Sequence, residues 1–127
     1  MNADKKSVDE LTERVIGCAM MVSNSLGCGF LEKVYENALA HELRKHGLCV
    51  QQQIPIEVSY DGVAVGVYVA DLIVNDLLVL ELKAARAIDD AHVAQCINFL
   101  KACGKSIGLI LNFGTPRLQI KRLVHNL

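Results

Sequence analysis

The sequence has few aromatic residues and none of the features of a membrane or secreted protein. It contains no Trp, three Tyr and three Phe, so few side chains are available to stack on nucleic-acid bases. No apolar run approaches the ~20 residues that a membrane-spanning helix needs. The N-terminus is charged and lacks the apolar stretch of a signal peptide. We therefore expect a cytoplasmic protein without a membrane partner.

The cysteines also lack a pattern. There are five of them, an odd number, and no two form a Cys-x-x-Cys pair, which fits a reducing compartment better than a disulfide framework. The chain has 127 residues, of which 52% are hydrophobic and 21% charged. This length and composition predict a single globular domain over residues 1–127.

Acidic residues are missing from the last third of the chain. Residues 1–90 carry all fourteen acids and eight of the thirteen Lys and Arg residues. Residues 91–127 carry the other five basic residues, Lys101, Lys105, Arg117, Lys121 and Arg122. This segment is a candidate contact for a polyanion, DNA in the first place and RNA as a second possibility. The competing interpretation is that these side chains only solvate a helix and an edge strand.

The most unusual stretch is residues 71–83, where Asp71, Glu81 and Lys83 interrupt an almost wholly apolar run. Runs rich in Val, Ile and Leu are typical of strands buried on both faces. The pair Asn75-Asp76 indicates a turn, so the stretch predicts a β-hairpin. A buried carboxylate needs a counter-charge or a metal ion.

The spacing of these charges limits their arrangement. Glu81 and Lys83 are two residues apart and share one face of a strand. A two-residue turn would place Asp71 opposite Leu80, whereas a three-residue loop would place it opposite Glu81; we predict the loop. Two opposed carboxylates repel each other, and Mg²⁺ or Mn²⁺ between them would turn the repulsion into a binding site. The competing interpretation is a structural ion pair with Lys83 and Arg86.

The remaining pattern predicts a mixed α/β fold of the α+β kind, with a central mixed sheet flanked by helices in the order α-α-β-β-β-α-β. The first helix would start at a capping box formed by Ser7 and Glu10. The last segment, residues 117–124, is either an edge strand or a short helix. The expected helices are residues 7–24, 30–46 and 88–102, and the expected strands are residues 49–60, 63–74, 77–84 and 106–112.

The second predicted helix carries a candidate acid. This acid is Glu32, which lies near the expected core stripe of the helix. Taken alone, it would be a first-turn glutamate that interacts favourably with the helix N-terminus. The stripe consists of Leu31, Val34, Tyr35, Ala38 and Leu43.

Residues 29–35 read Gly-Phe-Leu-Glu-Lys-Val-Tyr, and with the later Asp and Glu-x-Lys the chain resembles the GxxExxY proteins of the PD-(D/E)XK nuclease superfamily. The resemblance, which includes Leu-Asn-Phe-Gly at residues 111–114, implies a restriction-endonuclease-like core. It implies that Asp71, Glu81 and Glu32 hold a metal ion and that Lys83 assists the attacking water. Gln95 matches the Gln of a Gln-x-x-x-Tyr motif, although Phe99 replaces its Tyr.

The expected activity is therefore a nuclease dependent on Mg²⁺ or Mn²⁺ that cleaves DNA or RNA. A carboxylate-held cation and a neighbouring Lys suit the hydrolysis of a phosphodiester bond. The competing hypothesis is a catalytically inactive domain of the same fold that acts as a nucleic-acid-binding or protein-binding subunit. Because the chain is small, a homo-oligomer is also a reasonable expectation.

Overall fold

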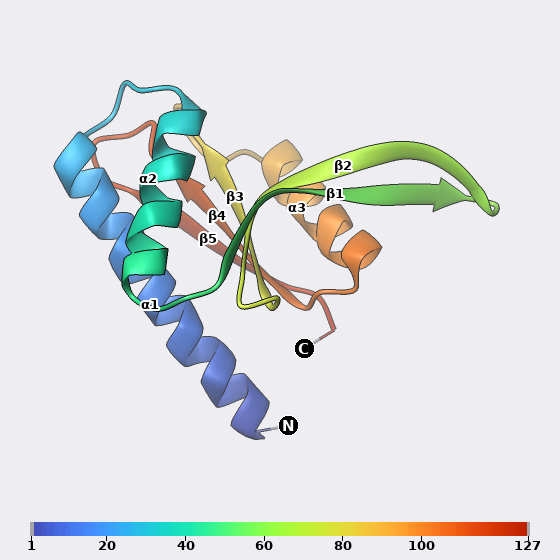
Figure 1. The fold of residues 1–127 in the computed structure, drawn as a ribbon. Helices are drawn as coiled ribbons and strands as arrows, with labels where there is room; N and C mark the ends of the chain where they lie inside the picture. The colour runs from blue at the N-terminus through green and yellow to red at the C-terminus, as the bar shows by residue number, and fades with distance from the viewer. Residues whose placement is uncertain (1, 127) are drawn as a thin grey trace.

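The computed structural model describes residues 2–126, with side chains from Lys5 onward. Five strands form one sheet in the order β1-β2-β3-β4-β5 (Figure 1). The first three strands run antiparallel, β4 lies parallel to β3, and β5 lies antiparallel to β4. The elements are α1 (Asn2–Leu26), α2 (Glu32–Lys45), β1 (Val50–Tyr60), β2 (Val63–Val74), β3 (Leu78–Lys83), α3 (Asp90–Cys103), β4 (Ile107–Asn112) and β5 (Gln119–Val124).

The predicted mixed sheet and its connections are confirmed. The helix α3 joins β3 to the parallel strand β4, as a crossover connection requires. The segment left open as a strand or a helix is the edge strand β5. Pro55 lies in β1, the other edge strand, where a residue without an N–H group is tolerated.

Two hydrophobic clusters form the core, one on each face of the sheet. The helices α1 and α2 cover the face that carries Leu72, Leu80 and Leu109. The helix α3 covers the opposite face, where Val79 and Ile110 are buried. The central strands β3 and β4 are thus covered on both faces, which explains why their sequences are almost continuously apolar.

The start of α1 was predicted wrongly. The helix begins at Asn2, so Ser7 lies inside it and does not cap it. The residues before Ser7 include Ala and Lys, which favour helices, and neither Pro nor Gly, so no residue there stops the helix from extending toward the N-terminus.

The buried face of α2 also differs from the prediction. Leu31 is 81% exposed and Val34 is 40% exposed, because the helix begins at Glu32 and Leu31 is its extended N-cap. The face that packs against the core is rotated toward Glu36 and Leu39, which the predicted stripe omitted. The buried residues of α2 are Tyr35, Glu36, Leu39, Ala40 and Leu43.

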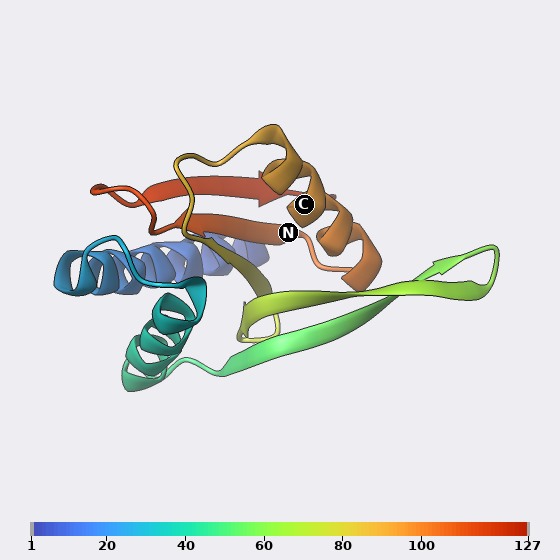
Figure 2. The ribbon, with the colours of Figure 1, turned by 90° about the horizontal axis from the view of Figure 1, so that it is seen from above.

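The outer half of the β1–β2 hairpin projects beyond the rest of the sheet as an arm (Figures 1 and 2). Its turn is Asp61-Gly62, with φ of 53° and 76°, and left-handed values at both positions are those of the tight hairpin turn that this dipeptide predicts. The residues of β2 from Val63 to Val69 are all exposed. None of the described helices is long and apolar enough to cross a membrane.

Candidate active site

The loop between β2 and β3 has the predicted odd length. Val74 pairs with Leu78, and Leu72 pairs with Leu80, so a three-residue loop separates the strands. One further step along this register places Asp71 opposite Glu81. The φ values at Asn75 and Asp76 are 52° and 54°, left-handed values that Asn and Asp adopt more readily than other non-glycine residues.

A cavity of about 300 Å³ brings together all five residues that the sequence singled out for catalysis. They come from four elements. Glu32 opens α2, Asp71 lies near the inner end of β2, Glu81 and Lys83 lie on β3, and Gln95 lies on α3.

The other walls of the cavity were not predicted. One wall is apolar and belongs to β2; it consists of Val67, Tyr68 and Val69. The other wall belongs to the face of α3 that carries Gln95, and it consists of His92, Cys96 and Phe99. His92 accepts a hydrogen bond at Nδ1 from the backbone N–H of Asp89, at 3.2 Å, as part of the capping box of α3. Its position three residues before Gln95 was the available sequence clue, because residues i and i+3 share a helix face.

The two opposed carboxyl groups are electrostatically unfavourable as a charged pair. Burial raises the pKa of Asp71, and the hydrogen bond from the Leu82 N–H, at 2.7 Å, opposes this rise. Burial, followed by the neighbouring Asp71, raises the pKa of Glu81 to about 8, although Lys83 lowers it. Ionisation of both carboxyl groups is therefore unfavourable in the metal-free cavity, and a bound cation would favour it.

Among residues whose side chains the structure describes, none forms an ion pair with these two carboxyl groups. Within the same part of the chain, neither Lys83 nor Arg86 forms a salt bridge. The alternative of a structural ion pair with Lys83 and Arg86 therefore has no support in the fold.

The donor set suits a hard divalent cation with open coordination positions. Within the described part of the chain, no group of three or more His, Cys, Asp or Glu side chains is placed to hold a metal ion. Glu32 lines the cavity without completing a triad with Asp71 and Glu81. Mg²⁺ in phosphoryl-transfer sites commonly uses one or two carboxylates together with water and substrate phosphate, and the Asp71–Glu81 pair fits this requirement.

The loop before α2 is held by Tyr35, the last residue of the Gly-x-x-Glu-x-x-Tyr segment. Its hydroxyl donates to the carbonyl oxygen of Gly27 at 2.6 Å and accepts from the Phe30 N–H at 3.2 Å. Its ring stacks on Phe113, with centroids 4.7 Å apart. This buried Tyr fixes the entry of the chain into α2 and thereby places Glu32 at the cavity.

The end of β3 is held by a buried amide in the Leu-Asn-Phe-Gly segment. Asn112 accepts from the Ala85 N–H and donates to the Ala85 carbonyl oxygen, each at 3.0 Å. A Cβ atom at Gly114 would lie 2.4 Å from the backbone of Ala85, so only glycine permits this close approach. The segment thus fixes the chain two residues after Lys83.

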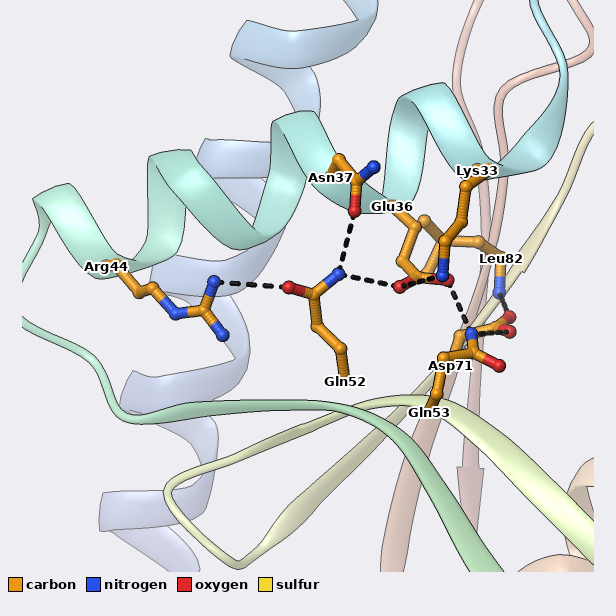
Figure 3. A network of polar contacts seen from close by, with 8 residues as sticks. All are labelled: Lys33, Glu36, Asn37, Arg44, Gln52, Gln53, Asp71 and Leu82. Atoms are coloured by element: carbon orange, nitrogen blue, oxygen red, sulfur yellow. Dashed lines mark hydrogen bonds and ion pairs between the residues drawn. The ribbon is translucent and has the colours of Figure 1, made fainter.

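Sequence reasoning also missed a polar network beside Asp71. Glu36 is buried, and its carboxylate accepts from Lys33, Gln52 and Gln53 (Figure 3). Gln53 also lies 3.5 Å from Asp71. The clue in the sequence was Glu36 itself, one helical turn after Glu32.

The five basic residues of the last third do not surround the cavity. Arg122 pairs with Asp9 at 2.6 Å, and Lys105 pairs with Asp76 at 3.0 Å, so acids from the first part of the chain offset two of the charges. Lys101 lines a separate groove between α3 and the hairpin arm, and Lys121 lines another groove beside β5. Arg117 is exposed just before β5.

Comparison with known proteins identifies a family and solved structures of similar fold. A model of the PD-(D/E)XK nuclease superfamily matches residues 9–123. No curated protein sequence matches the chain. Its fold is similar to the crystal structure of SSO0001 (18% identity, TM-score 0.55, 75% of this chain and 50% of that one). It is also similar to an alkaline exonuclease from Laribacter hongkongensis (14% identity, TM-score 0.50, 74% and 56% of the two chains). The chain thus spans about half the length of these structures.

Proposed function

Because the chain belongs to the PD-(D/E)XK nuclease superfamily, we propose that it hydrolyses phosphodiester bonds in a reaction that depends on a divalent metal ion. The observation that carries this proposal is the cavity, which gathers the carboxylates of Asp71 and Glu81 and the ammonium group of Lys83 without pairing them in salt bridges. A buried pair of like charges costs stability, so its presence in the cavity favours a functional role.

Each residue has a role in this proposal. Asp71 and Glu81 would hold Mg²⁺ or Mn²⁺, with Glu32 as an additional ligand when substrate is present. The bound cation would stabilise charge on the phosphate and lower the pKa of water. Lys83 would orient the attacking water and offset charge on the phosphate oxygens. Gln95 would contact the substrate or a water molecule from the α3 side of the cavity.

The proposed substrate is DNA, with RNA as the second candidate. Lys101, Arg117 and Lys121 have no acidic partner within hydrogen-bonding distance among the described residues, and they would contact the phosphate backbone outside the cavity. Lys105 and Arg122 would have to leave their ion pairs with Asp76 and Asp9 before they could contact the phosphate backbone. A second copy of the chain would supply additional surface for the substrate. We also propose that the chain is a GxxExxY protein, on the basis of the Gly-x-x-Glu-x-x-Tyr segment at residues 29–35.

The deciding measurement is calorimetric titration of Mn²⁺ into the wild type and into Asp71→Ala, with and without an oligonucleotide. We expect binding to the wild type that strengthens when phosphate oxygens are present, and no binding to the variant. Binding to the wild type would justify a cleavage assay on single- and double-stranded DNA and RNA. If neither protein binds Mn²⁺ under any condition, the competing role of an inactive binding subunit is favoured.

A further inference from the structure

Glu36 is the one charged side chain that is fully buried within the described part of the molecule. Its carboxylate accepts from Gln53 Nε2 at 2.6 Å, from Gln52 Nε2 at 2.7 Å and from Lys33 Nζ at 3.1 Å. The Lys33 side chain is 60% exposed, and an ion pair with so exposed a partner contributes little. The two glutamine amides are therefore the main partners of this buried charge.

Gln53 connects Glu36 with Asp71. An amide group has two hydrogens to donate, and Nε2 of Gln53 lies 2.6 Å from Glu36 Oε1 and 3.5 Å from Asp71 Oδ1 (Figure 3). The shorter bond fixes the amide, and the longer contact directs its second hydrogen toward Asp71. Polar side chains from α2, β1 and β2 thus meet at one carboxylate of the cavity.

The backbone of Gln53 is in an unusual conformation. Its φ is 54°, a left-handed value that is unfavourable for a residue with a side chain. The β1–β2 ladder pairs Gln52 with Leu72 and Ile54 with Ala70, so the strained residue lies opposite Asp71. Strain of this kind persists where the surroundings hold it in place, and it concentrates at functional sites.

The other oxygen of Asp71 is also held. Oδ2 accepts the Leu82 N–H at 2.7 Å, so contacts from β1 and β3 approach the carboxylate on two sides. The terminal torsion of an Asp side chain has a broad energy profile. Without the contact from Gln53, one hydrogen bond would remain to set the orientation of the group.

We propose that Gln53 and Glu36 are positioning residues of the cavity: Glu36 holds the Gln53 amide, and this amide holds Asp71 in the orientation that a divalent cation shared with Glu81 requires. This inference rests on the proposed function. The geometry supports it, because one amide nitrogen of Gln53 lies 2.6 Å from Glu36 and 3.5 Å from Asp71 and so links the two carboxyl groups. The negative charge of Glu36 would add to the attraction for a cation.

Gln52 provides a matched control. It also donates to Glu36, but its other contacts are with Asn37 and Arg44 of α2 and it does not touch Asp71. A network that only fastened α2 to β1 would depend on Gln52 as much as on Gln53. Of the two glutamines, only Gln53 contacts Asp71, so a network that positions Asp71 depends on Gln53 and Glu36 rather than on Gln52.

The test is Mn²⁺ titration calorimetry on the wild type and on Gln53→Gly, Glu36→Gln, Gln52→Ala and Asp71→Ala, with oligonucleotide present. The thermal midpoint of each metal-free variant is measured in parallel. Glycine accepts the left-handed backbone, so Gln53→Gly removes the side chain without adding strain. Glu36→Gln keeps the side-chain volume and some of the hydrogen bonds, so it serves as the second test if Gln53→Gly fails to fold.

We expect the dissociation constant for Mn²⁺ to rise about 10–100-fold in Gln53→Gly and in Glu36→Gln. Gln52→Ala should bind Mn²⁺ with wild-type affinity, even if its thermal midpoint falls as far as those of Gln53→Gly and Glu36→Gln. Wild-type affinity in both Gln53→Gly and Glu36→Gln, with binding lost in Asp71→Ala, would overturn the positioning role and leave the proposed function standing. If the wild type itself does not bind Mn²⁺, both proposals fail.

Discussion

The strand β2 consists of two segments with opposite surroundings. The inner segment, residues 70–74, is buried apart from the partly exposed Asp71, whereas the outer segment, residues 63–69, is exposed throughout. Both segments have similar apolar sequences and both pair with β1. The difference is that β3 and the helices cover only the inner segment. Similar strand sequences thus form packed core at one end of β2 and a projecting arm at the other.

This contrast explains where the charged groups lie. A carboxylate keeps a fixed place only where packed neighbours prevent it from moving, and Asp71 is the first residue of β2 along the chain direction to be flanked by buried positions on both sides. The outer segment contributes Val67, Tyr68 and Val69 to the cavity wall but no charged group. We therefore expect chemistry and stability to depend on the inner segment and its partner β3.

The largest expected effect is that of Lys83→Ala. Lys83 lines the cavity together with Asp71 and Glu81, and loss of one group that stabilises developing charge costs about 10²–10³ in rate. Cleavage of an oligonucleotide should fall by that factor, while calorimetry should show Mn²⁺ binding close to that of the wild type. Unchanged turnover would remove Lys83 from the mechanism, and loss of metal binding would make it a structural residue instead.

The pH dependence of stability should reveal the carboxylate pair. The pKa of Glu81 rises from 4.5 to about 8 in the folded protein, so the folded state favours the protonated form. The resulting stabilisation is present below about pH 4.5 and is lost as the pH rises through about 8. At about 1.4 kcal/mol per pKa unit, the change amounts to a few kcal/mol in the metal-free protein.

Urea denaturation between pH 5 and 8, in the presence of EDTA, would measure this change. The wild type should lose stability over that range, and Glu81→Gln should lose less because its neutral amide does not titrate. Adding Mg²⁺ should recover stability of the wild type at pH 8, since a ligand that binds only the folded state stabilises it. Parallel curves for the two proteins would show that Glu81 is not the group responsible.

Val74→Ala tests the packing of the inner segment. Val74 is fully buried against the core beneath α1 and α2. Removing two methyl groups there should lower the free energy of unfolding by about 1.5–3 kcal/mol, through lost burial and the cavity left behind. Chemical denaturation gives this value directly, and a change below about 0.5 kcal/mol would mean that the inner segment is less tightly packed than the structure indicates.

Val65→Ala is the matched substitution in the outer segment and should have the smallest effect. Val65 is 60% exposed, so we expect a change in unfolding free energy of about 0.5 kcal/mol or less. The same denaturation experiment applies. A loss as large as that of Val74→Ala would show that the arm is covered in solution, for example by a second copy of the chain.

The sequence by itself determined the order of the elements, the mixed sheet and the three-residue loop at residues 75–77, because these depend on local periodicity and turn chemistry. It also selected the five side chains that meet at the cavity. Strand spacing indicated Asp71, Glu81 and Lys83, and the family resemblance added Glu32 and Gln95. Only the tertiary structure decided which face of α2 is buried, because helical periodicity fixes the residues that share a face and not the face that meets the core. The same holds for the left-handed Gln53 between Glu36 and Asp71, and for the acids that pair with Lys105 and Arg122. These contacts join residues that are 17 to 113 positions apart in the chain, a separation over which no local pattern carries information.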